Sequence, residues 1–539
     1  MPAVKPNSAR YHLPWQAAAW IVLAAALLAV VVARVRLAGL PLERDEGEYA
    51  YSGQLLLLGI PPYKLAYTMK LPGTASAYAL VMWLFGQSST AIHLGLAVVN
   101  LVTIALVYLL ARDLFGPIGG AVAAGCYSVL SLMPQVLGTA AHATHFVVLF
   151  SVAGSLLLRR SLDRKSFPLI FASGLFFGLA VLMKQPGAFF ALFGLVFLAL
   201  YDWRSRFELK TMLSRSLSFV IAASIPGLVT ALLLWNAGVF GKFWFWIFKY
   251  ATEYGSEVTL SEGFQLFAGH IFGVIGTAWP IWALGFAGLV ALALDRALRP
   301  VAGFLLLFSV FSAIAVCPGL YFRPHYFILF LPALALISSA GVVSALNKVQ
   351  VKVGKLRFVI LLIWAGCLGF PLWMERDFFF ELPLDQANVL INGTNPFPES
   401  IKIGEYIREH SNGNDKIAVL GSEPQIYFYS KRLSATGYIY TYGLMEPQPY
   451  ARKMQQEMIQ EIEAAQPRFL VLVAMNRSWL AGADSDQTIL RWADRYCQDN
   501  YEEVGLINIF DRGTDYYFSA RPAGVEPAPD HIVIYRRKT

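Results

Sequence analysis

Residues 15–37 read WQAAAWIVLAAALLAVVVARVRL, and this stretch decides the class of fold. A helix needs about 20 mostly apolar residues to cross the hydrocarbon core of a bilayer, and this run is long enough. It exceeds the apolar part of a secretory signal peptide, and an acidic cluster follows it where a small-residue cleavage site would stand. We therefore expect a first membrane-spanning helix that the chain retains.

The whole chain has the composition of a membrane protein. Of its 539 residues, 57% are hydrophobic and 14% are charged, which excludes an ordinary soluble protein. Further apolar windows predict a polytopic, mainly α protein with about eleven spans. The windows are 15–37, 88–111, 117–134, 142–158, 168–183, 187–201, 216–235, 269–294, 301–317, 325–346 and 356–374.

The distribution of Lys and Arg predicts the orientation. The net charge is +8, but most cations lie in short loops between apolar windows, which is typical of topology determinants and argues against nucleic-acid binding. The loops 159–166, 202–210, 295–299 and 347–357 are strongly basic, so we expect them and the N-terminus to be cytoplasmic. An odd number of spans then places everything after about residue 375 on the outer side.

The sequence therefore divides into a predicted membrane domain, 1–375, and a soluble outer domain, 376–539. In the outer domain an amphipathic helix (399–411) and a charged helix (450–465) alternate with apolar strands, as in an α/β fold. The strands are expected at 416–421, 469–474, 503–510 and 531–536.

The first outer loop, 39–87, is long. Its segments 45–58 and 73–85 are too short or too polar to span a bilayer, so they predict two helices at the membrane surface.

The first of these helices begins in the acidic stretch LERDEGEYAY, residues 42–51. A helix that starts near Asp45 points Glu46 elsewhere and projects four residues from one face, namely Asp45, Glu48, Tyr49 and Ser52. Acidic residues also cap helices and interact favourably with the dipole of the first turn. Taken alone, the cluster is equally explained as a structural feature.

Cations, histidines and a phenol are expected on the same side of the membrane as this acidic face. Each of them taken singly has a structural explanation, such as snorkelling to lipid headgroups or pairing with an acid. Together with the carboxylates they suit a substrate that combines a lipid tail, a phosphate and a nucleophilic acceptor. They are Lys70, Lys184, His142, His145, Arg323, His325 and Tyr326.

Four features carry a resemblance to a known family. They are the pair Asp45–Glu46 with Tyr49–Ala50 shortly after it, Lys70 two residues before Pro72, Lys184 at the end of an apolar run, and RPHYFILFLPALAL at 323–336. This pattern resembles glycosyltransferase family 39 of the GT-C superfamily, which includes the protein O-mannosyltransferases and the bacterial lipid A aminoarabinose transferase. The resemblance covers about residues 15–375.

The resemblance implies a GT-C-type bundle and inverting transfer of a hexosyl or pentosyl group from a polyprenyl-phosphate donor, on the outer face. Asp45 occupies the family's position for the general base. Lys70, Lys184 and Arg323 are candidates for stabilising the departing phosphate. Glu46 is a second catalytic candidate, and the remaining candidates for substrate binding are Glu48, Tyr49, His142, His145, His325 and Tyr326.

The resemblance also implies a bacterial inner membrane with a periplasmic C-terminal domain. The acceptor is left open among protein, lipid A and polysaccharide, and membrane lipids are the other expected partners. The segment 421–432 either lies near the sugar site or is only an apolar strand and loop.

No cofactor and no metal are expected. Met69 stands where the aminoarabinose transferase has an acid directly before its lysine, and a donor without a diphosphate does not demand a divalent cation. The alternative ligand set is His142 and His145 with Glu46 or His325.

The sequence leaves two other classes of function open. A transporter or flippase for a lipid-linked saccharide requires polar groups near mid-membrane and broken helices, and Pro226, Pro280 and Pro332 do interrupt spans. A catalytically silent scaffold that binds envelope components is the third possibility.

Overall fold

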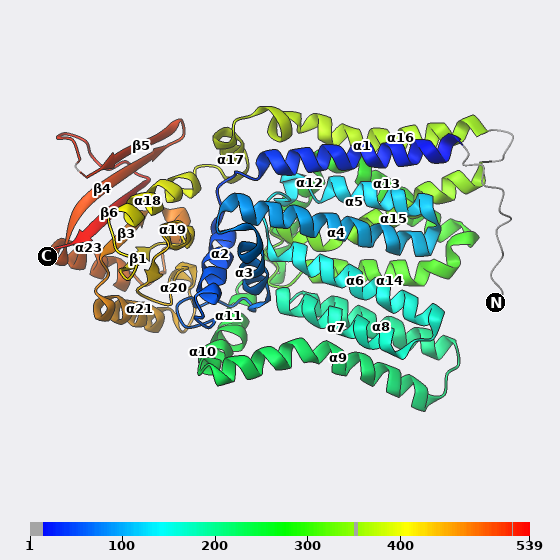
Figure 1. Cartoon of the computed structure of the whole chain (residues 1–539), viewed down its shortest axis with the longest axis horizontal. Coiled ribbons are helices and arrows are strands. Elements are labelled where there is room, and N and C mark those ends of the chain that lie inside the picture. Colours follow the sequence, from blue (N-terminus) through cyan, green and yellow to red (C-terminus); the bar gives the residue numbers. More distant parts are fainter. Residues whose placement is uncertain (1–13, 350–353, 520, 539) are drawn as a thin grey trace.

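The computed structural model describes residues 14–349, 354–519 and 521–538. The chain forms a bundle of long helices, followed by a smaller part that combines a sheet with short helices (Figure 1). Helices α2 and α3 lie at the end of the bundle that faces the sheet, so the two parts meet around the first outer loop.

The bundle confirms the predicted polytopic architecture. Within the described residues, nine helical stretches are long and apolar enough to cross a membrane, and each coincides with one of the expected windows. The windows 117–134 and 168–183 form the shorter helices α5 and α7. In the window 269–294 a short 3-10 helix, Gly276–Ala278, joins α12 to α13. The bundle helices are α1 (Pro14–Leu37), α4 (Ser89–Phe115), α5 (Pro117–Leu130), α6 (Ala143–Arg164), α7 (Phe167–Met183), α8 (Gly187–Arg204), α9 (Leu209–Asn236), α12 (Leu260–Ile275), α13 (Trp279–Leu294), α14 (Arg299–Val316), α15 (Leu331–Lys348) and α16 (Gly354–Met374).

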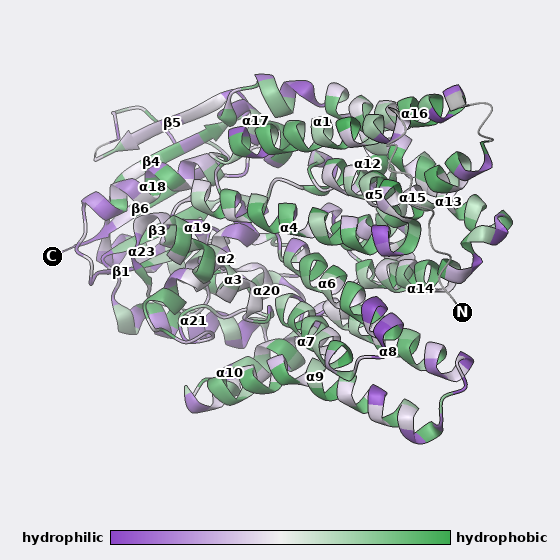
Figure 2. Ribbon diagram, turned by 45° about the vertical axis from the view of Figure 1, so that its right-hand side comes forward, coloured by the Kyte–Doolittle hydropathy of each residue, from purple (hydrophilic) through white to green (hydrophobic). Residues whose placement is uncertain are grey.

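Helix α15 is the core of the bundle. In the span Pro324–Lys348 the most apolar window is 89% buried, against 22% for the peripheral α9. Helix α13 packs so closely on α15 that glycine is required at position 288 of α13. A Cβ there would lie 1.9 Å from the carbonyl oxygen of Ile337 in α15. The outer helices leave apolar side chains exposed along their length, as expected for contact with lipid. The ribbon of these helices is mostly coloured as hydrophobic in Figure 2.

The predicted surface helices form as α2 (Arg44–Leu57) and α3 (Gly73–Phe85). A second group of short helical segments follows α9 near the same end of the bundle. It consists of α10 (Phe240–Trp244), the π-helical segment η2 (Phe245–Tyr250) and α11 (Ala251–Gly255).

The C-terminal part is an α/β domain built on one mixed sheet with the order β2-β1-β3-β6-β4-β5. Strand β1 pairs in parallel with β2 and β3, whereas β6 runs antiparallel to β3 and β4. The four expected strands are β1 (Lys416–Leu420), β3 (Phe469–Ala474), β4 (Tyr501–Phe510) and β6 (His531–Arg537), and the sequence analysis missed β2 (Leu433–Ser434) and β5 (Gly513–Phe518). The helices are α17 (Leu384–Asn392), α18 (Phe397–Glu409), α19 (Gln425–Ser430), α20 (Tyr442–Met445), α21 (Ala451–Ala465), α22 (Asn476–Trp479) and α23 (Thr488–Asn500).

Candidate active site

A cavity of about 270 Å³ lies where the bundle, the first outer loop and the C-terminal domain meet. The bundle contributes Lys184 and Arg323, the first outer loop contributes Asp45 and Lys70, and the C-terminal domain contributes Tyr440. Residues far apart in the sequence therefore share one pocket.

The acidic stretch forms the start of α2, and two of its carboxylates have a structural role. Glu43 is the N-cap, and its side chain accepts a hydrogen bond from the backbone N–H of Glu46, whose own carboxylate accepts from the backbone N–H of Glu43. Glu46 also accepts from the backbone N–H of Ala141 at 2.6 Å and lies 3.0 Å from His93 Nε2. Burial raises the pKa of Glu43 to about 8, with Asp45 and Glu46 adding to the effect. The structure thus places Glu46 in the anchoring of α2 to the bundle, outside the pocket wall.

Asp45 and Glu48 point together toward one cation, as their helical spacing predicted. The ammonium of Lys70 lies 2.8 Å from Asp45 Oδ1 and 2.6 Å from Glu48 Oε2, and it sits 4.5 Å from the centre of the Tyr49 ring. Burial by itself would raise the pKa of Asp45, but Lys70 holds that pKa well below its usual range. Asp45 is therefore an ionised carboxylate at the pocket wall.

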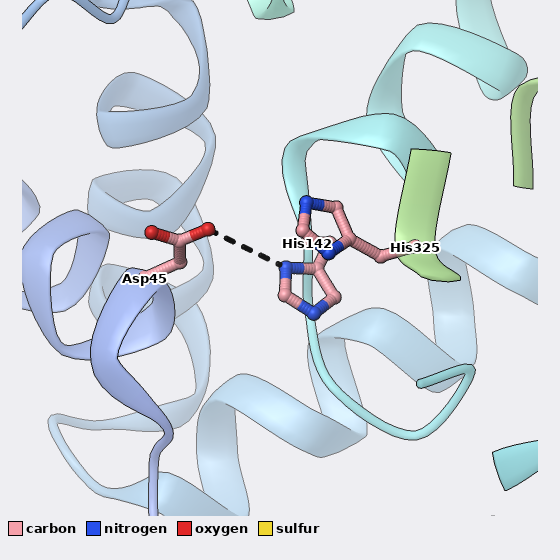
Figure 3. A group of neighbouring side chains, drawn as sticks. All are labelled: Asp45, His142 and His325. Atoms are coloured by element: carbon pink, nitrogen blue, oxygen red, sulfur yellow. Dashed lines mark ion pairs between the residues drawn. The ribbon is translucent and has the colours of Figure 1, made fainter. Parts of the chain in front are cut away.

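Two histidines approach Asp45 from the bundle (Figure 3). The rings of His142 and His325 are stacked with their centres 4.0 Å apart, and His142 Nδ1 lies 4.0 Å from Asp45 Oδ2. Burial lowers the pKa of His142 to about 4, although Asp45 acts in the opposite direction. The imidazole of His142 is therefore neutral at physiological pH.

The other predicted cations also face the pocket. Lys184 follows the last residue of α7, and its ammonium lies 4.2 Å from the centre of the Tyr326 ring. Burial lowers the pKa of Lys184 to about 7, although the negative charge of Asp45 acts in the opposite direction. Arg323 lines the same wall, 5.3 Å from the centre of the Tyr321 ring. Lys70, Lys184 and Arg323 together favour an anionic group in the pocket.

The structure does not bring every predicted residue to the pocket. His145 is buried in α6, and neither of its ring nitrogens has a hydrogen-bond partner within the described residues. Tyr49 lies beneath Lys70 and not on the pocket surface.

Asp45, His142 and His325 are also ligand types for a metal, and their ligand atoms lie within 4.8 Å of one another. One oxygen of Asp45 already accepts from Lys70, and Lys184 contributes a further positive charge to the surroundings of His142. A dication at this place would face unfavourable electrostatics. The absence of a metal from the site stays a prediction.

The contribution of the C-terminal domain to the pocket was not predicted from the sequence. Tyr440, Tyr442 and Glu446 line the pocket, and Lys70 Nζ lies 5.7 Å from the centre of the Tyr440 ring. Glu446 accepts a hydrogen bond of 2.5 Å from the hydroxyl of Tyr250, and burial raises its pKa to about 7. No local pattern marks this segment, since only the docking of the two domains brings it to the pocket.

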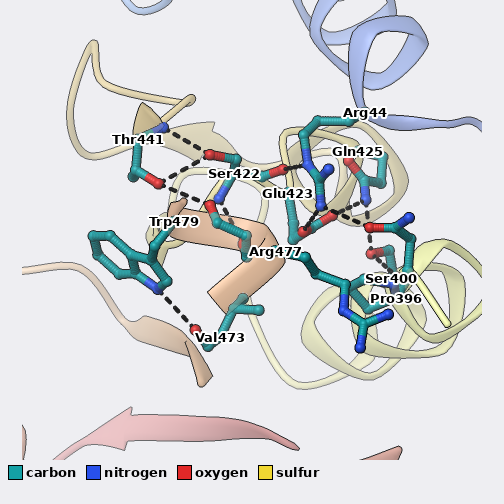
Figure 4. A network of polar contacts seen from close by, with 12 residues as sticks. Arg44, Pro396, Ser400, Ser422, Glu423, Gln425, Thr441, Val473, Arg477 and Trp479 are labelled. Carbon is teal, nitrogen blue, oxygen red and sulfur yellow. Dashed lines mark hydrogen bonds and ion pairs between the residues drawn. The ribbon is translucent and has the colours of Figure 1, made fainter. Parts of the chain in front are cut away.

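A buried polar network joins α2 to the C-terminal domain (Figure 4). Arg44 donates to Glu423 at 2.6 Å and to the carbonyl of Ser422 at 2.6 Å, and its guanidinium lies 5.5 Å from the ring centre of Tyr442. The helices touch closely as well, because a Cβ at Gly47 would lie 2.7 Å from the backbone nitrogen of Gln425. The segment 421–432 thus docks on α2, one residue from Asp45, and does not itself line the pocket.

One family model matches part of the chain. Residues 70–235 match the model of the family described as dolichyl-phosphate-mannose-protein mannosyltransferase. No curated protein sequence matches the chain.

Solved structures of similar fold cover nearly all of the chain. The structure of ArnT from Cupriavidus metallidurans bound to undecaprenyl phosphate matches with a TM-score of 0.59 at 17% identity, over 96% of this chain and 98% of that one. The Archaeoglobus fulgidus oligosaccharyltransferase tethered to an acceptor peptide matches with a TM-score of 0.55 at 12% identity, over 94% and 75%. The archaeal oligosaccharyltransferase AglB from the same organism, in complex with an inhibitory peptide and a dolichol-phosphate, matches with a TM-score of 0.54 at 14% identity, over 94% and 75%.

These likenesses agree with the resemblance found in the sequence and with the polytopic bundle and C-terminal sheet seen in the structure. The protein has the GT-C fold, with a soluble α/β domain at its C-terminal end.

Proposed function

We propose that the protein is an inverting glycosyltransferase that moves a sugar from a polyprenyl-phosphate donor to an acceptor of the cell envelope. The reaction takes place on the outer face of a bacterial inner membrane, with the N-terminus cytoplasmic and the C-terminal domain in the periplasm. The observation that supports this most is the pocket in which Asp45 faces Lys70, Lys184 and Arg323.

The chemistry of transfer suits this arrangement. The acceptor hydroxyl attacks the anomeric carbon, the bond from that carbon to the phosphate oxygen breaks, and the hydroxyl proton passes to Asp45 as general base. The departing lipid phosphate gains negative charge, which buried cations stabilise better than water does. The donor phosphate also competes with Asp45 for the ammonium of Lys70, and losing that ion pair makes Asp45 a stronger base.

The pocket also offers a place for the lipid part of such a donor. Ile247, Ala315 and Leu329 line it beside the charged groups, so one cavity presents both apolar and cationic walls. Solved proteins with this fold are described with undecaprenyl phosphate or dolichol-phosphate bound, which supports the same class of donor.

The transporter interpretation has less support. It requires ionisable groups near mid-membrane, whereas Asp45, Lys70, Lys184 and Arg323 all line one pocket at the end of the bundle that meets the C-terminal domain. A separate buried pair, Asp202 with Arg215 at 3.0 Å, lies near the C-terminal end of α8.

Native mass spectrometry of the purified protein tests the proposal. We expect a co-purified polyprenyl phosphate that carries one sugar, because the pocket combines cations with an apolar wall. The variant Asp45→Asn should still bind this lipid but should not transfer the sugar, whereas Glu405→Gln, on an exposed part of α18, should behave as the wild type. Transfer by Asp45→Asn at the wild-type rate would refute the assignment of the base, and lipid movement in liposomes without a covalent product would favour transport.

A further inference from the structure

A second cavity, of about 480 Å³, lies beside the candidate active site. One wall comes from α10 and η2, which supply Lys242 and Trp246, and the opposite wall is the helix α21. Trp246 and Met454 line both cavities, so the two are neighbours with a shared wall. The reaction proposed above makes no use of this second cavity.

Aromatic rings form much of its apolar surface. Phe245 and Tyr450 meet edge to face with their centres 5.1 Å apart, and Trp246 contacts Tyr438 at 6.0 Å in the same manner. These contacts hold the rings in place before any ligand arrives. A sugar ring has apolar C–H faces and polar hydroxyl edges, and fixed aromatic rings beside polar groups match both.

The polar groups of the cavity favour neutral hydroxyls over charged ligands. Glu457 accepts a hydrogen bond of 2.7 Å from the hydroxyl of Tyr438 and forms an ion pair with Lys242, so this carboxylate is already engaged. Gln456 and Gln460 are exposed on α21, and their side chains have no hydrogen-bond partner among the residues that the structure describes. An amide donates and accepts hydrogen bonds, as a sugar hydroxyl does.

We propose that this cavity is the subsite for the saccharide part of the acceptor, so that the acceptor is a glycan or a molecule that carries one. The proposal rests on the transferase function proposed above and narrows its acceptor. The cavity falls within the range of about 300–1,000 Å³ that is typical of small-molecule sites. A lipid chain suits it poorly, because Lys242, Lys453 and the two amides belong to its wall. A bound saccharide would present its attacking hydroxyl to Asp45 past Trp246 and Met454.

Saturation-transfer NMR on the full-length protein in nanodiscs tests this subsite directly. The probes are soluble oligosaccharides of two to four residues built from glucose, mannose, galactose or N-acetylglucosamine, and a decapeptide that contains Ser and Thr. The test variant carries Gln456→Ala and Gln460→Ala, and Glu405→Ala on the exposed face of α18 is the matched control. Binding of undecaprenyl phosphate, measured in the same samples, reports on the donor pocket and separates a failure of the transferase function from a failure of the subsite.

We expect at least one oligosaccharide to bind the wild type and the control, and its affinity to fall about tenfold in the double variant, because two hydrogen-bonding side chains are lost. Undecaprenyl phosphate binding should not change. The proposal is overturned if no oligosaccharide binds the wild type or if the double variant binds as well as the control. Binding of the decapeptide that the double variant abolishes would also overturn it, in favour of a peptide acceptor.

Discussion

The contact between Arg44 and Glu423 gives a quantitative test of how the C-terminal domain holds the active site. The two side chains are 10% and 0% exposed and lie 2.6 Å apart. Glu423→Gln keeps the shape of the side chain but removes its charge, which leaves a buried guanidinium without a counter-charge. Breaking a buried pair in this way costs about 3–5 kcal/mol, a large part of the roughly 5–15 kcal/mol that stabilises a typical domain.

We expect this loss to appear first where the domain meets α2. Arg44 precedes Asp45, and Tyr442 packs over its guanidinium, so the segment 437–446 should open more often in the variant. At about 1.4 kcal/mol for each factor of ten, a loss of 3 kcal/mol accelerates backbone amide exchange in this segment about a hundredfold. Hydrogen exchange followed by mass spectrometry measures the change, and sugar transfer should fall together with it.

An exposed ion pair in the same domain provides the control. Glu502 and Arg536 lie 2.7 Å apart with side chains 49% and 38% exposed, and Glu502→Gln should cost no more than about 1 kcal/mol. The double variant Arg44→Met with Glu423→Met should recover much of the stability, because no charge is then left buried. Equal exchange rates in Glu423→Gln and Glu502→Gln would refute the role given to the buried pair.

Three further predictions concern the pocket itself. Asp45→Asn should slow sugar transfer about 10²- to 10⁴-fold and leave the thermal midpoint of unfolding normal. Glu46→Gln should chiefly lower that midpoint, because Glu46 anchors α2. The reverse result would exchange the roles of the two residues. Lys184 loses its proton as the pH rises through about 7, so undecaprenyl phosphate should bind more weakly at pH 8 than at pH 6. Lys184→Arg should remove this pH dependence of binding. If the variant keeps the pH profile of the wild type, Lys184 is not the group that binds the phosphate. Chelation with EDTA should leave the rate of sugar transfer unaltered. A metal site would be established if EDTA abolished transfer and zinc restored it in the wild type but not in the double variant His142→Ala, His325→Ala.

Local patterns predicted much of the helical part. Apolar runs of spanning length identify the membrane helices because a bilayer requires them, whatever their neighbours are. Likewise, the spacing of Asp45 and Glu48 predicted a shared face, which Lys70 occupies. Helical periodicity fixes such directions before the helix packs on anything.

The contributions that escaped prediction are those that depend on docking. Helical spacing already pointed Glu46 away from Asp45, but its partners, the backbone N–H of Ala141 and the ring of His93, come from the bundle and were not predicted. The segment with Tyr440 and Glu446 has no distinctive pattern, and it reaches the pocket only because Arg44 and Glu423 join α2 to the C-terminal domain.

The sequence by itself determined where the apolar helices lie, the helical start at the acidic stretch and the face that carries Asp45. Each of these follows from interactions between near neighbours or with the bilayer. Only the tertiary structure decided what Glu46 contacts on the other face, where it anchors α2 to the bundle. It also decided that the soluble domain completes the pocket and forms a second cavity beside it, because contacts between residues distant in the chain exist only once both domains have packed.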